Sequence, residues 1–319
     1  MVDGLPVQGP IRYQTEPELP MALEIEVLDT GDLELDSQFL VLGRNAGEPT
    51  NVPTLSFLIT GGEEPVLVDT GFREEQIMQR LGMQGFRPDE FRLETQLANH
   101  DLAPKDIGYI LHTHLHIDHA GQDDQFPMET AVVIDRQELE YAVSGIMGKQ
   151  YPPEDIKHLV DRLHEDRALA LLDLEATGGE TIIPGVQCVP AGGHTEGSMN
   201  VLVETDEGTA VICGDVIYDI HHQVIEPHPP ANSGRIGVRE PAPTGNQGTS
   251  KRQEKGAIKK ALHAGEFVLP IHDRPAKVNE RGEVIGRLHD RVPGPVTPLE
   301  DVTLPEFKFG ADSPLDLES

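Results

Sequence analysis

The sequence predicts an α/β protein, a four-layer αββα sandwich that forms a single domain. Two series of short apolar segments, one within residues 23–68 and one within residues 181–271, have the length and composition of buried strands. Segments with helical spacing lie between the two series and before the last strand of the second. This order favours two sheets packed face to face with helices outside. No Pro- or Gly-rich linker clearly divides the chain, so we expect one domain.

Composition sets the expected boundaries of that domain. Residues 1–21 are rich in Pro and Glu and are expected to form an N-terminal arm, whereas residues 22–290 would form the folded domain. Residues 291–319 are Pro-rich and acidic and predict a C-terminal tail. Residues 221–250 are crowded with Pro, Gly and His and predict a long loop or lid. Unstructured connections longer than about 12–15 residues usually have a function.

Individual elements follow from apolar periodicity. The first half predicts strands at residues 23–28, 39–42, 55–59, 66–68, 107–111 and 131–134. Helices are expected at residues 135–144 and over most of 145–180, which Gly178 and Gly179 close. The second half predicts strands at residues 186–189, 199–203, 210–213 and 267–271, and a helix at 251–263.

Charge and cysteine content restrict the expected partners and location. Among 319 residues, 55 are acidic and 25 basic, which gives a formal net charge of −30. Such a surface repels phosphate backbones and anionic lipids, so neither nucleic acid nor a membrane is an expected partner. The two cysteines, Cys188 and Cys213, exclude a disulfide framework. The N-terminal residues show no signal-peptide pattern, and no apolar stretch approaches the ~20 residues that span a bilayer, so we expect a cytoplasmic protein.

Residues 112–121, with the sequence HTHLHIDHAG, concentrate potential metal ligands. They hold four imidazoles and one carboxylate within eight positions, which suits neither a helix face nor a core strand. Neutral imidazole and carboxylate are ligands that zinc, iron(II) and manganese accept. The segment therefore predicts a metal centre.

Further candidate ligands stand where other apolar strands stop. Asp69 and Asp215 each end a predicted strand, His194 follows a Gly-Gly turn, and His272 ends the last strand. Such residues can converge on one edge of a sandwich, where loops on a rigid scaffold commonly carry function.

The spacing of His114, His116, Asp118 and His119 resembles the His-x-His-x-Asp-His pattern of the metallo-β-lactamase-fold superfamily, over roughly residues 22–290. The resemblance implies two divalent metal ions, with zinc expected and iron or manganese as alternatives. It places His114, His116 and His194 on the first ion, Asp118, His119 and His272 on the second, and Asp215 between them. Asp69 would orient a ligand histidine through its free ring nitrogen, and His112 is expected to be structural.

Within this superfamily, the sequence is similar to the N-acyl homoserine lactonases. Tyr218 lies three residues after Asp215, as in that group, where the phenol hydrogen-bonds the substrate carbonyl. Residues 194–198, His-Thr-Glu-Gly-Ser, resemble the group's His-Thr-Pro-Gly-His but depart from it at Glu196 and Ser198. The resemblance implies a quorum-quenching hydrolase that opens a lactone ester by attack of a metal-bound hydroxide. Tyr218 would stabilise the oxyanion, and Asp118 would carry a proton to the leaving alkoxide.

The expected partner is a small-molecule lactone or ester, and a homodimer is left open because lactonase relatives commonly dimerise. An acyl chain would need an apolar groove, for which Met21, Phe72, Met83 and Phe86 are candidates. Three alternatives remain on the same scaffold: a glyoxalase II-like thioesterase, an iron-dependent redox enzyme and a non-catalytic binding protein.

Overall fold

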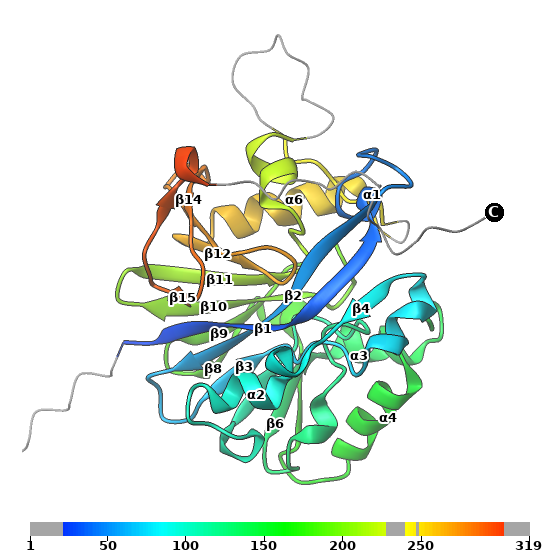
Figure 1. The fold of residues 1–319 in the computed structure, drawn as a ribbon. Coiled ribbons are helices and arrows are strands. Elements are labelled where there is room, and N and C mark those ends of the chain that lie inside the picture. Colours follow the sequence, from blue (N-terminus) through cyan, green and yellow to red (C-terminus); the bar gives the residue numbers. More distant parts are fainter. Residues whose placement is uncertain (1–21, 228–239, 247–248, 303–319) are drawn as a thin grey trace, which may run out of the picture.

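The computed structural model describes residues 22–227, 240–246 and 249–302, and these residues form the predicted four-layer αββα sandwich (Figure 1). The first sheet has 8 strands in the order β15-β1-β2-β3-β5-β6-β7, with β4 paired to β1. Its strands are β1 (Glu24–Asp36), β2 (Pro49–Thr60), β3 (Val66–Val68), β4 (Gln84–Phe86), β5 (Tyr109–Leu111), β6 (Ala131–Asp135), β7 (Leu169–Leu172) and β15 (Arg291–Val292).

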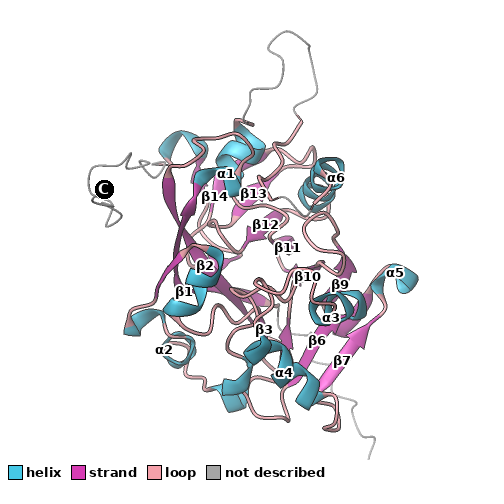
Figure 2. Ribbon diagram, turned by 90° about the vertical axis from the view of Figure 1, so that its right-hand side faces the viewer, coloured by secondary structure: helices cyan, strands magenta, loops and turns pink. Residues whose placement is uncertain are grey.

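The second sheet also has 8 strands, in the order β16-β14-β13-β12-β11-β10-β9-β8. Its strands are β8 (Glu180–Ile183), β9 (Val186–Pro190), β10 (Met199–Thr205), β11 (Gly208–Gly214), β12 (Phe267–Pro270), β13 (Ala276–Val278), β14 (Val284–Arg287) and β16 (Thr297–Pro298). Figure 2 shows this sheet edge-on in its upper part, with α6 (Lys251–Leu262) along its outer side.

Helices cover the outer faces of both sheets. The α-helices that precede β8 are α1 (Ser37–Leu40), α2 (Leu93–Ala98), α3 (Arg136–Val143), α4 (Pro153–Arg162) and α5 (Leu174–Thr177). Short 3₁₀ turns are η1 (Glu75–Leu81), η2 (Asp89–Phe91), η3 (Pro104–Asp106), η4 (Asp123–Gln125) and η6 (Leu299–Asp301), and η5 (His221–Ile225) is a π-helix. One apolar cluster packs α2, α3 and α4 on the first sheet, and another packs α6 on the second.

The largest apolar cluster lies between the two sheets. Phe57 and Val68 of the first sheet contact the same cluster as Val201 and Leu269 of the second, and all four side chains are fully buried. Burial of this apolar surface is the main force that holds the sheets face to face.

The sandwich brings the ends of four strands to one edge. Strands β3 and β5 are parallel, with Val68 opposite Leu111, and β11 and β12 are parallel, with Ile212 opposite Leu269. Backbone hydrogen bonds join the two sheets there, because the Ile271 carbonyl accepts from the Leu55 amide at 2.9 Å and the Thr113 carbonyl accepts from the Met199 amide at 2.9 Å. The residues that follow these strands are therefore held close together.

Two sequence-based assignments were wrong. Residues 39–42, predicted as a strand, form the end of α1 and the turn after it, and the Asp36 carboxylate caps α1 by accepting from the Gln38 amide at 3.0 Å. Residues 145–180, predicted as mostly helical, contain strand β7, which pairs with β6 at the edge of the first sheet. Its Leu-Ala-Leu-Leu sequence favours a helix by intrinsic propensity, and pairing with β6 overrides that preference.

The expected terminal and loop segments differ in how much of them the structure describes. The arm at residues 1–21 lies outside the described residues. The expected tail contributes β15 and β16 to the two sheets before residue 302. Within residues 221–250, η5 is followed by a buried stretch at 241–244, where the Ala242 amide donates to the Gln223 carbonyl at 2.9 Å. None of the described helices combines the length and apolarity needed to cross a bilayer.

Arg162 on α4 binds the segment that follows the His-rich residues, and its contribution to stability can be tested. Its fully buried guanidinium donates to the carbonyls of Thr130 at 2.8 Å, Phe126 at 3.1 Å and Asp123 at 3.2 Å. Arg162→Leu should lower the free energy of unfolding by about 3 kcal/mol or more, because buried carbonyls that lose their donors cost about 1–3 kcal/mol each. Urea denaturation of the chelator-treated protein measures this change.

The matched control is Arg136→Leu. The interaction seen for Arg136 is an ion pair with Asp173 at the surface, with Nε 2.6 Å from Oδ1. Such pairs contribute little to the free energy of unfolding. An equal loss of stability in both variants would contradict the role given to Arg162.

Candidate metal centre

Residues 112–121 leave β5 and are tied to the end of β3. The Thr70 amide donates to the His119 carbonyl at 2.7 Å, and the Gly121 amide donates to the Gly71 carbonyl at 2.9 Å. A Cβ atom at position 121 would collide with the backbone of residues 71–73, so glycine is required for this approach. The loop therefore has a fixed path along the edge where the two sheets meet.

Asp69 fixes the side chains of this loop. Its carboxylate accepts from the Thr113 amide at 2.9 Å and the Thr113 hydroxyl at 2.7 Å, and it lies 2.8 Å from Nδ1 of His119. Asp69 has a φ of 58°, a left-handed conformation that costs energy outside glycine and is often found at functional sites. Burial alone would raise the pKa of Asp69, but His119 and His112 outweigh burial and lower it. Asp69 is thus an anionic acceptor that turns Nε2 of His119 towards the site.

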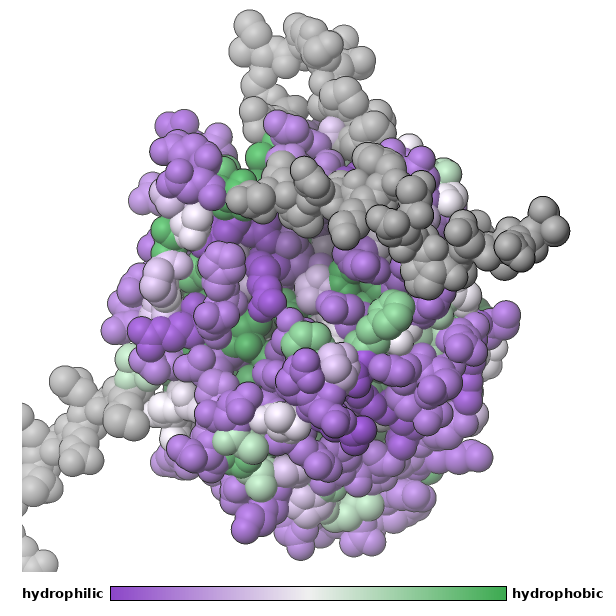
Figure 3. All heavy atoms as spheres, in the orientation of Figure 1, coloured by the Kyte–Doolittle hydropathy of each residue, from purple (hydrophilic) through white to green (hydrophobic). Residues whose placement is uncertain are grey.

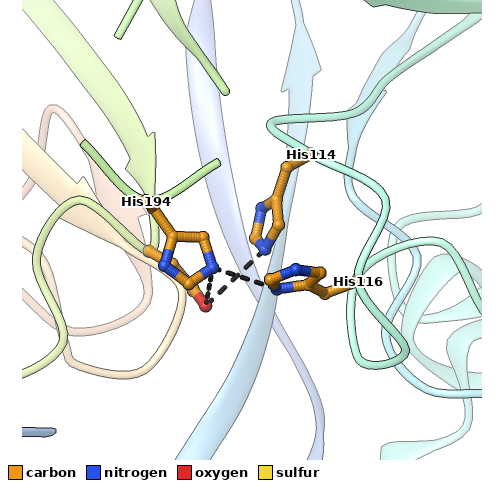
Figure 4. A group of neighbouring side chains, drawn as sticks. His114, His116 and His194 are labelled. Atoms are coloured by element: carbon orange, nitrogen blue, oxygen red, sulfur yellow. Dashed lines mark hydrogen bonds and ion pairs between the residues drawn. The ribbon is translucent and has the colours of Figure 1, made fainter. Parts of the chain in front are cut away.

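The first group of candidate ligands contains His114, His116, His194 and Asp215, whose ligand atoms all lie within 4.8 Å of one another (Figure 4). Nε2 of His194 is 3.0 Å from Nδ1 of His116 and 3.3 Å from Oδ2 of Asp215. Nε2 of His114 is 3.7 Å from the same oxygen. Three imidazoles from two loops therefore face one carboxylate oxygen at the end of β11.

The second group contains Asp118, His119 and His272, whose ligand atoms also lie within 4.8 Å of one another. Nε2 of His272 is 3.4 Å from Oδ2 of Asp118, and its Nδ1 is 3.0 Å from the carbonyl oxygen of Pro53. The contact with Pro53 sets the ring so that Nε2 faces the group. All three residues are exposed by 9% or less.

Asp215 lies between the two groups. Its Oδ2 atom faces His194 and His114, whereas its Oδ1 atom is 3.1 Å from Nε2 of His119 and 3.2 Å from Nε2 of His272. The structure thus brings together all seven side chains that the sequence predicts as ligands.

The donor set fits two divalent cations. Nε2 of His114, Nε2 of His119 and Oδ1 of Asp215 are buried and have no hydrogen-bond partner among the described residues. Buried polar atoms without partners are costly, and a cation bound by imidazole and carboxylate would satisfy all three. Burial, together with His119, His116 and His194, holds the pKa of His114 well below its usual range, so this imidazole is neutral and able to bind a metal.

Tyr218 lies beside Asp215, as expected from its place three residues later in the sequence. Its hydroxyl donates to Oδ2 of Asp215 at 2.5 Å, and its ring stacks on His272 with centroids 5.2 Å apart. Its amide donates at 2.7 Å to the side-chain oxygen of Gln223, a fully buried residue on η5. Burial and the neighbouring Asp215 raise the pKa of Tyr218 well above its usual value, so the phenol keeps its proton.

An apolar pocket of about 150 Å³ opens onto both groups. His116, Asp118, His194, Asp215, Tyr218 and His272 form its polar end. Its apolar wall comes from β1, β2, α1, η1 and the turn that follows η1, and consists of Leu33, Leu35, Phe39, Val52, Leu81 and Met83.

The predicted substrate-pocket residues separate into three outcomes. Met83 lines the pocket, whereas Met21 lies outside the described residues. Phe72 was expected at the pocket but is fully buried below it, where its ring lies against Gly31 and under Arg87. Phe86 is 39% exposed on β4 and is not among the described residues that line the pocket. The short turn η1 directs Met83 inwards and leaves Phe86 on the surface.

Sequence reasoning anticipated only one of three further buried polar residues that support the site. His112, expected to be structural, belongs to neither ligand group and links Asp69 at 3.3 Å to Asp123 at 2.9 Å. Gln223 and Glu138 are equally buried and bond the chain beside Tyr218 and His116. Glu138 and Gln223 have no distinctive spacing, so no sequence signal could have found them.

Comparison with known proteins agrees with this geometry. The sequence model of the metallo-beta-lactamase superfamily matches residues 49–255. An N-acyl homoserine lactonase of Bacillus cereus is 30% identical over 176 residues, which cover 52% of this chain and 64% of that protein. The N-acyl homoserine lactonase AiiB of Rhizobium rhizogenes is 24% identical over 248 residues, covering 68% of this chain and 83% of AiiB. The chain thus spans somewhat less than two thirds of the length of the Bacillus cereus relative.

Solved structures share the fold. A probable metal-dependent hydrolase from Staphylococcus aureus superposes with a TM-score of 0.62 at 19% identity and covers 85% of this chain and 98% of its own. An N-acyl homoserine lactone hydrolase with N-hexanoyl-L-homoserine at its catalytic metal centre gives a TM-score of 0.54 at 24% identity, over 65% of this chain and 80% of its own. The fold, the ligand pattern and the family match lead to one conclusion: the chain belongs to the metallo-beta-lactamase superfamily.

Proposed function

We propose that this protein is a metal-dependent hydrolase that opens the lactone ring of an N-acyl homoserine lactone or a closely similar ester. The observation that carries the proposal is the arrangement at Asp215, which faces both ligand groups while Tyr218 holds a phenol proton beside them. The lactonase relatives support the same reaction class.

His114, His116 and His194 would hold one ion, Asp118, His119 and His272 a second, and Asp215 would lie between them. Zinc suits this set of imidazole and carboxylate ligands, and iron and manganese remain alternatives. The chemistry that such ions supply is Lewis-acid activation of an ester carbonyl and of a water molecule. The remaining steps depend on side chains of this chain.

Tyr218 is placed to stabilise the developing oxyanion. Its hydroxyl lines the pocket and stays protonated, so it can turn from Asp215 to the oxygen of a bound ester. The Gln223 contact fixes its backbone, which keeps the donor in place before substrate arrives. A preorganised donor of this kind stabilises the transition state more than the ground state.

Asp118 is placed to move the proton. Burial alone would raise its pKa, but His119 and His272 outweigh burial and lower it, so the group is a carboxylate at neutral pH. Asp118 lines the same pocket as Tyr218. It can therefore accept the proton of the attacking water and pass it to the ring oxygen as the carbon–oxygen bond breaks.

The surroundings of the site favour a neutral substrate with an apolar chain. The pocket wall would bury such a chain, since six of its residues are apolar. A wider groove adjoins it at His116 and His194, and its charged residues among those described are Glu140, Glu175, Glu196 and Lys260. Figure 3 shows a largely hydrophilic face around small apolar areas. In the groove, the carboxylates of an acylglutathione would meet three acidic residues and one basic residue, which disfavours the thioesterase alternative.

Metal binding can be tested one group at a time. Chelator-treated protein should bind about two equivalents of Zn²⁺ or Co²⁺, and His194→Ala and His272→Ala should each keep about one tight equivalent, because each removes a ligand from one group only. Equilibrium dialysis with elemental analysis measures the stoichiometry. The exposed residue His164 supplies the control His164→Ala, which should bind as much metal as the unaltered chain. Full binding by both ligand variants would argue against the two-group arrangement.

Substrate class is tested by proton release from the zinc-loaded protein on a medium-chain N-acyl homoserine lactone and, in parallel, on an acylglutathione thioester. We expect kcat/KM above ~10⁴ M⁻¹s⁻¹ on the lactone and weak turnover of the thioester. Homoserine lactone without an acyl chain should be a poor substrate, since it leaves the apolar wall unfilled. Turnover of the thioester alone would replace the lactonase proposal with the thioesterase alternative.

Tyr218→Phe tests the oxyanion donor. The change removes only the hydroxyl, so kcat on the lactone should fall about 100-fold, the usual loss for one such donor, while metal content stays unchanged. Tyr109→Phe is the control, since Tyr109 packs against the core between the sheets. If kcat is the same in Tyr218→Phe as in the unaltered protein, Tyr218 has no part in the chemistry.

A further inference from the structure

A carboxylate that the proposed reaction does not use lies buried behind the first ligand group. Glu138 on α3 is only 1% exposed. Its Oε1 atom accepts from the Leu115 amide at 3.0 Å and from the Tyr151 hydroxyl at 3.0 Å, and its Oε2 atom accepts from the Thr195 hydroxyl at 2.6 Å. Removing a carboxylate from water is costly unless several donors replace the water, and these donors do so.

Each of these donors either lies next to a candidate ligand in the sequence or contacts one. Leu115 stands between His114 and His116, and Thr195 directly follows His194. The ring of Tyr151 meets the ring of His116 edge to face, with centroids 4.9 Å apart. One carboxylate therefore contacts both loops that supply the three imidazoles of the first group.

The loop at residues 194–198 is also shaped for this contact. The Ser198 hydroxyl accepts from the Thr195 amide at 3.0 Å and lies 2.6 Å from the Thr195 hydroxyl, which sets that hydroxyl towards Glu138. A Cβ atom at Gly197 would collide with the backbone of Glu138, so glycine is needed for the loop to rest on α3. The residues at 197 and 198 thus bring the His194 loop to the carboxylate.

The carboxylate of Glu138 does not serve its own helix. At the third position of a helix, a glutamate commonly reaches back to the amide of the capping residue. In α3 the cap is Asp135, whose side chain accepts from the Gln137 amide at 2.8 Å, while Glu138 accepts from the two loops instead. The position of Glu138 is therefore explained by the site rather than by helix capping.

We propose that Glu138 is a positioning residue that joins the His114–His116 loop to the His194 loop and so sets the geometry of the first metal. This inference rests on the proposed metal-dependent function but not on the identity of its substrate. Without the carboxylate, the Leu115 amide and the Thr195 hydroxyl lose their shared acceptor, and the three imidazoles no longer have fixed relative positions. Partners of this kind commonly change metal affinity about 10–100-fold.

The experiment measures each ligand group by itself, in a background where the other group has lost one of its ligands. In His272→Ala the remaining ion occupies the first group, and in His194→Ala it occupies the second. Adding Glu138→Gln should weaken Co²⁺ binding about tenfold or more in the first background and alter the visible absorption of the bound Co²⁺. The same substitution should leave affinity and spectrum unchanged in the second background. In the otherwise unaltered enzyme it should lower kcat and leave KM unchanged.

Two further variants keep the inference open to refutation. Thr195→Val removes one donor without burying a new polar group and should weaken the first group in the same direction, which decides the matter if Glu138→Gln does not fold. Asp135→Ala removes the cap of α3 and should lower stability without changing Co²⁺ affinity.

Unchanged Co²⁺ affinity and spectrum in the first background would overturn the inference, as would equal weakening in both backgrounds or by Asp135→Ala. Because the readout is Co²⁺ binding, a failure of lactone turnover would refute the substrate while leaving the role of Glu138 intact.

Discussion

The site depends on the packing of the two sheets against each other. The apolar cluster between them holds β3 and β5 of one sheet opposite β11 and β12 of the other, so that the carboxyl ends of all four strands meet at one edge. No single sheet could supply the whole constellation, because Asp69 and the His-rich loop come from the first sheet and Asp215 and His272 from the second. The apolar cluster between the sheets therefore positions the candidate ligands, although it lies away from them.

Bringing so many polar groups into that edge has an energetic cost, and the chain offsets it with fixed partners. Asp69 uses both oxygens on Thr113, His112 and His119, and Glu138 uses both on Leu115, Tyr151 and Thr195. These hydrogen bonds orient the loops without occupying the ring nitrogens that face inwards. Nε2 of His114, Nε2 of His119 and Oδ1 of Asp215 face the space between the groups and are among the ten buried side-chain atoms in the described part of the chain that form no hydrogen bond. A cation bound between the groups would satisfy all three.

Sequence reasoning predicted most of the fold and the cluster of candidate ligands, because both leave local signals. Buried strands read as apolar runs, and the spacing of His114, His116, Asp118 and His119 is specific enough to identify one loop. Errors arose where tertiary contacts outweigh local preference. Residues 39–42 have a strand-like composition but begin within the capped helix α1, and β7 has helix-forming residues but pairs at a sheet edge. Glu138 and Gln223 escaped notice because their role depends on which loops surround them and not on their spacing.

The sequence predicts one end of the substrate pocket and not the other. Its polar end is formed by residues that the superfamily pattern anticipates, whereas its wall comes from β1, β2, α1, η1 and the turn after η1, where the sequence gives no comparable pattern. Met83 reaches the pocket and Phe72 does not, although both are large apolar residues close to Asp69 in the chain. None of the six wall residues belongs to either group of candidate ligands. Candidate ligands and pocket wall thus come from separate parts of the chain, an arrangement that lets one fold serve many substrates.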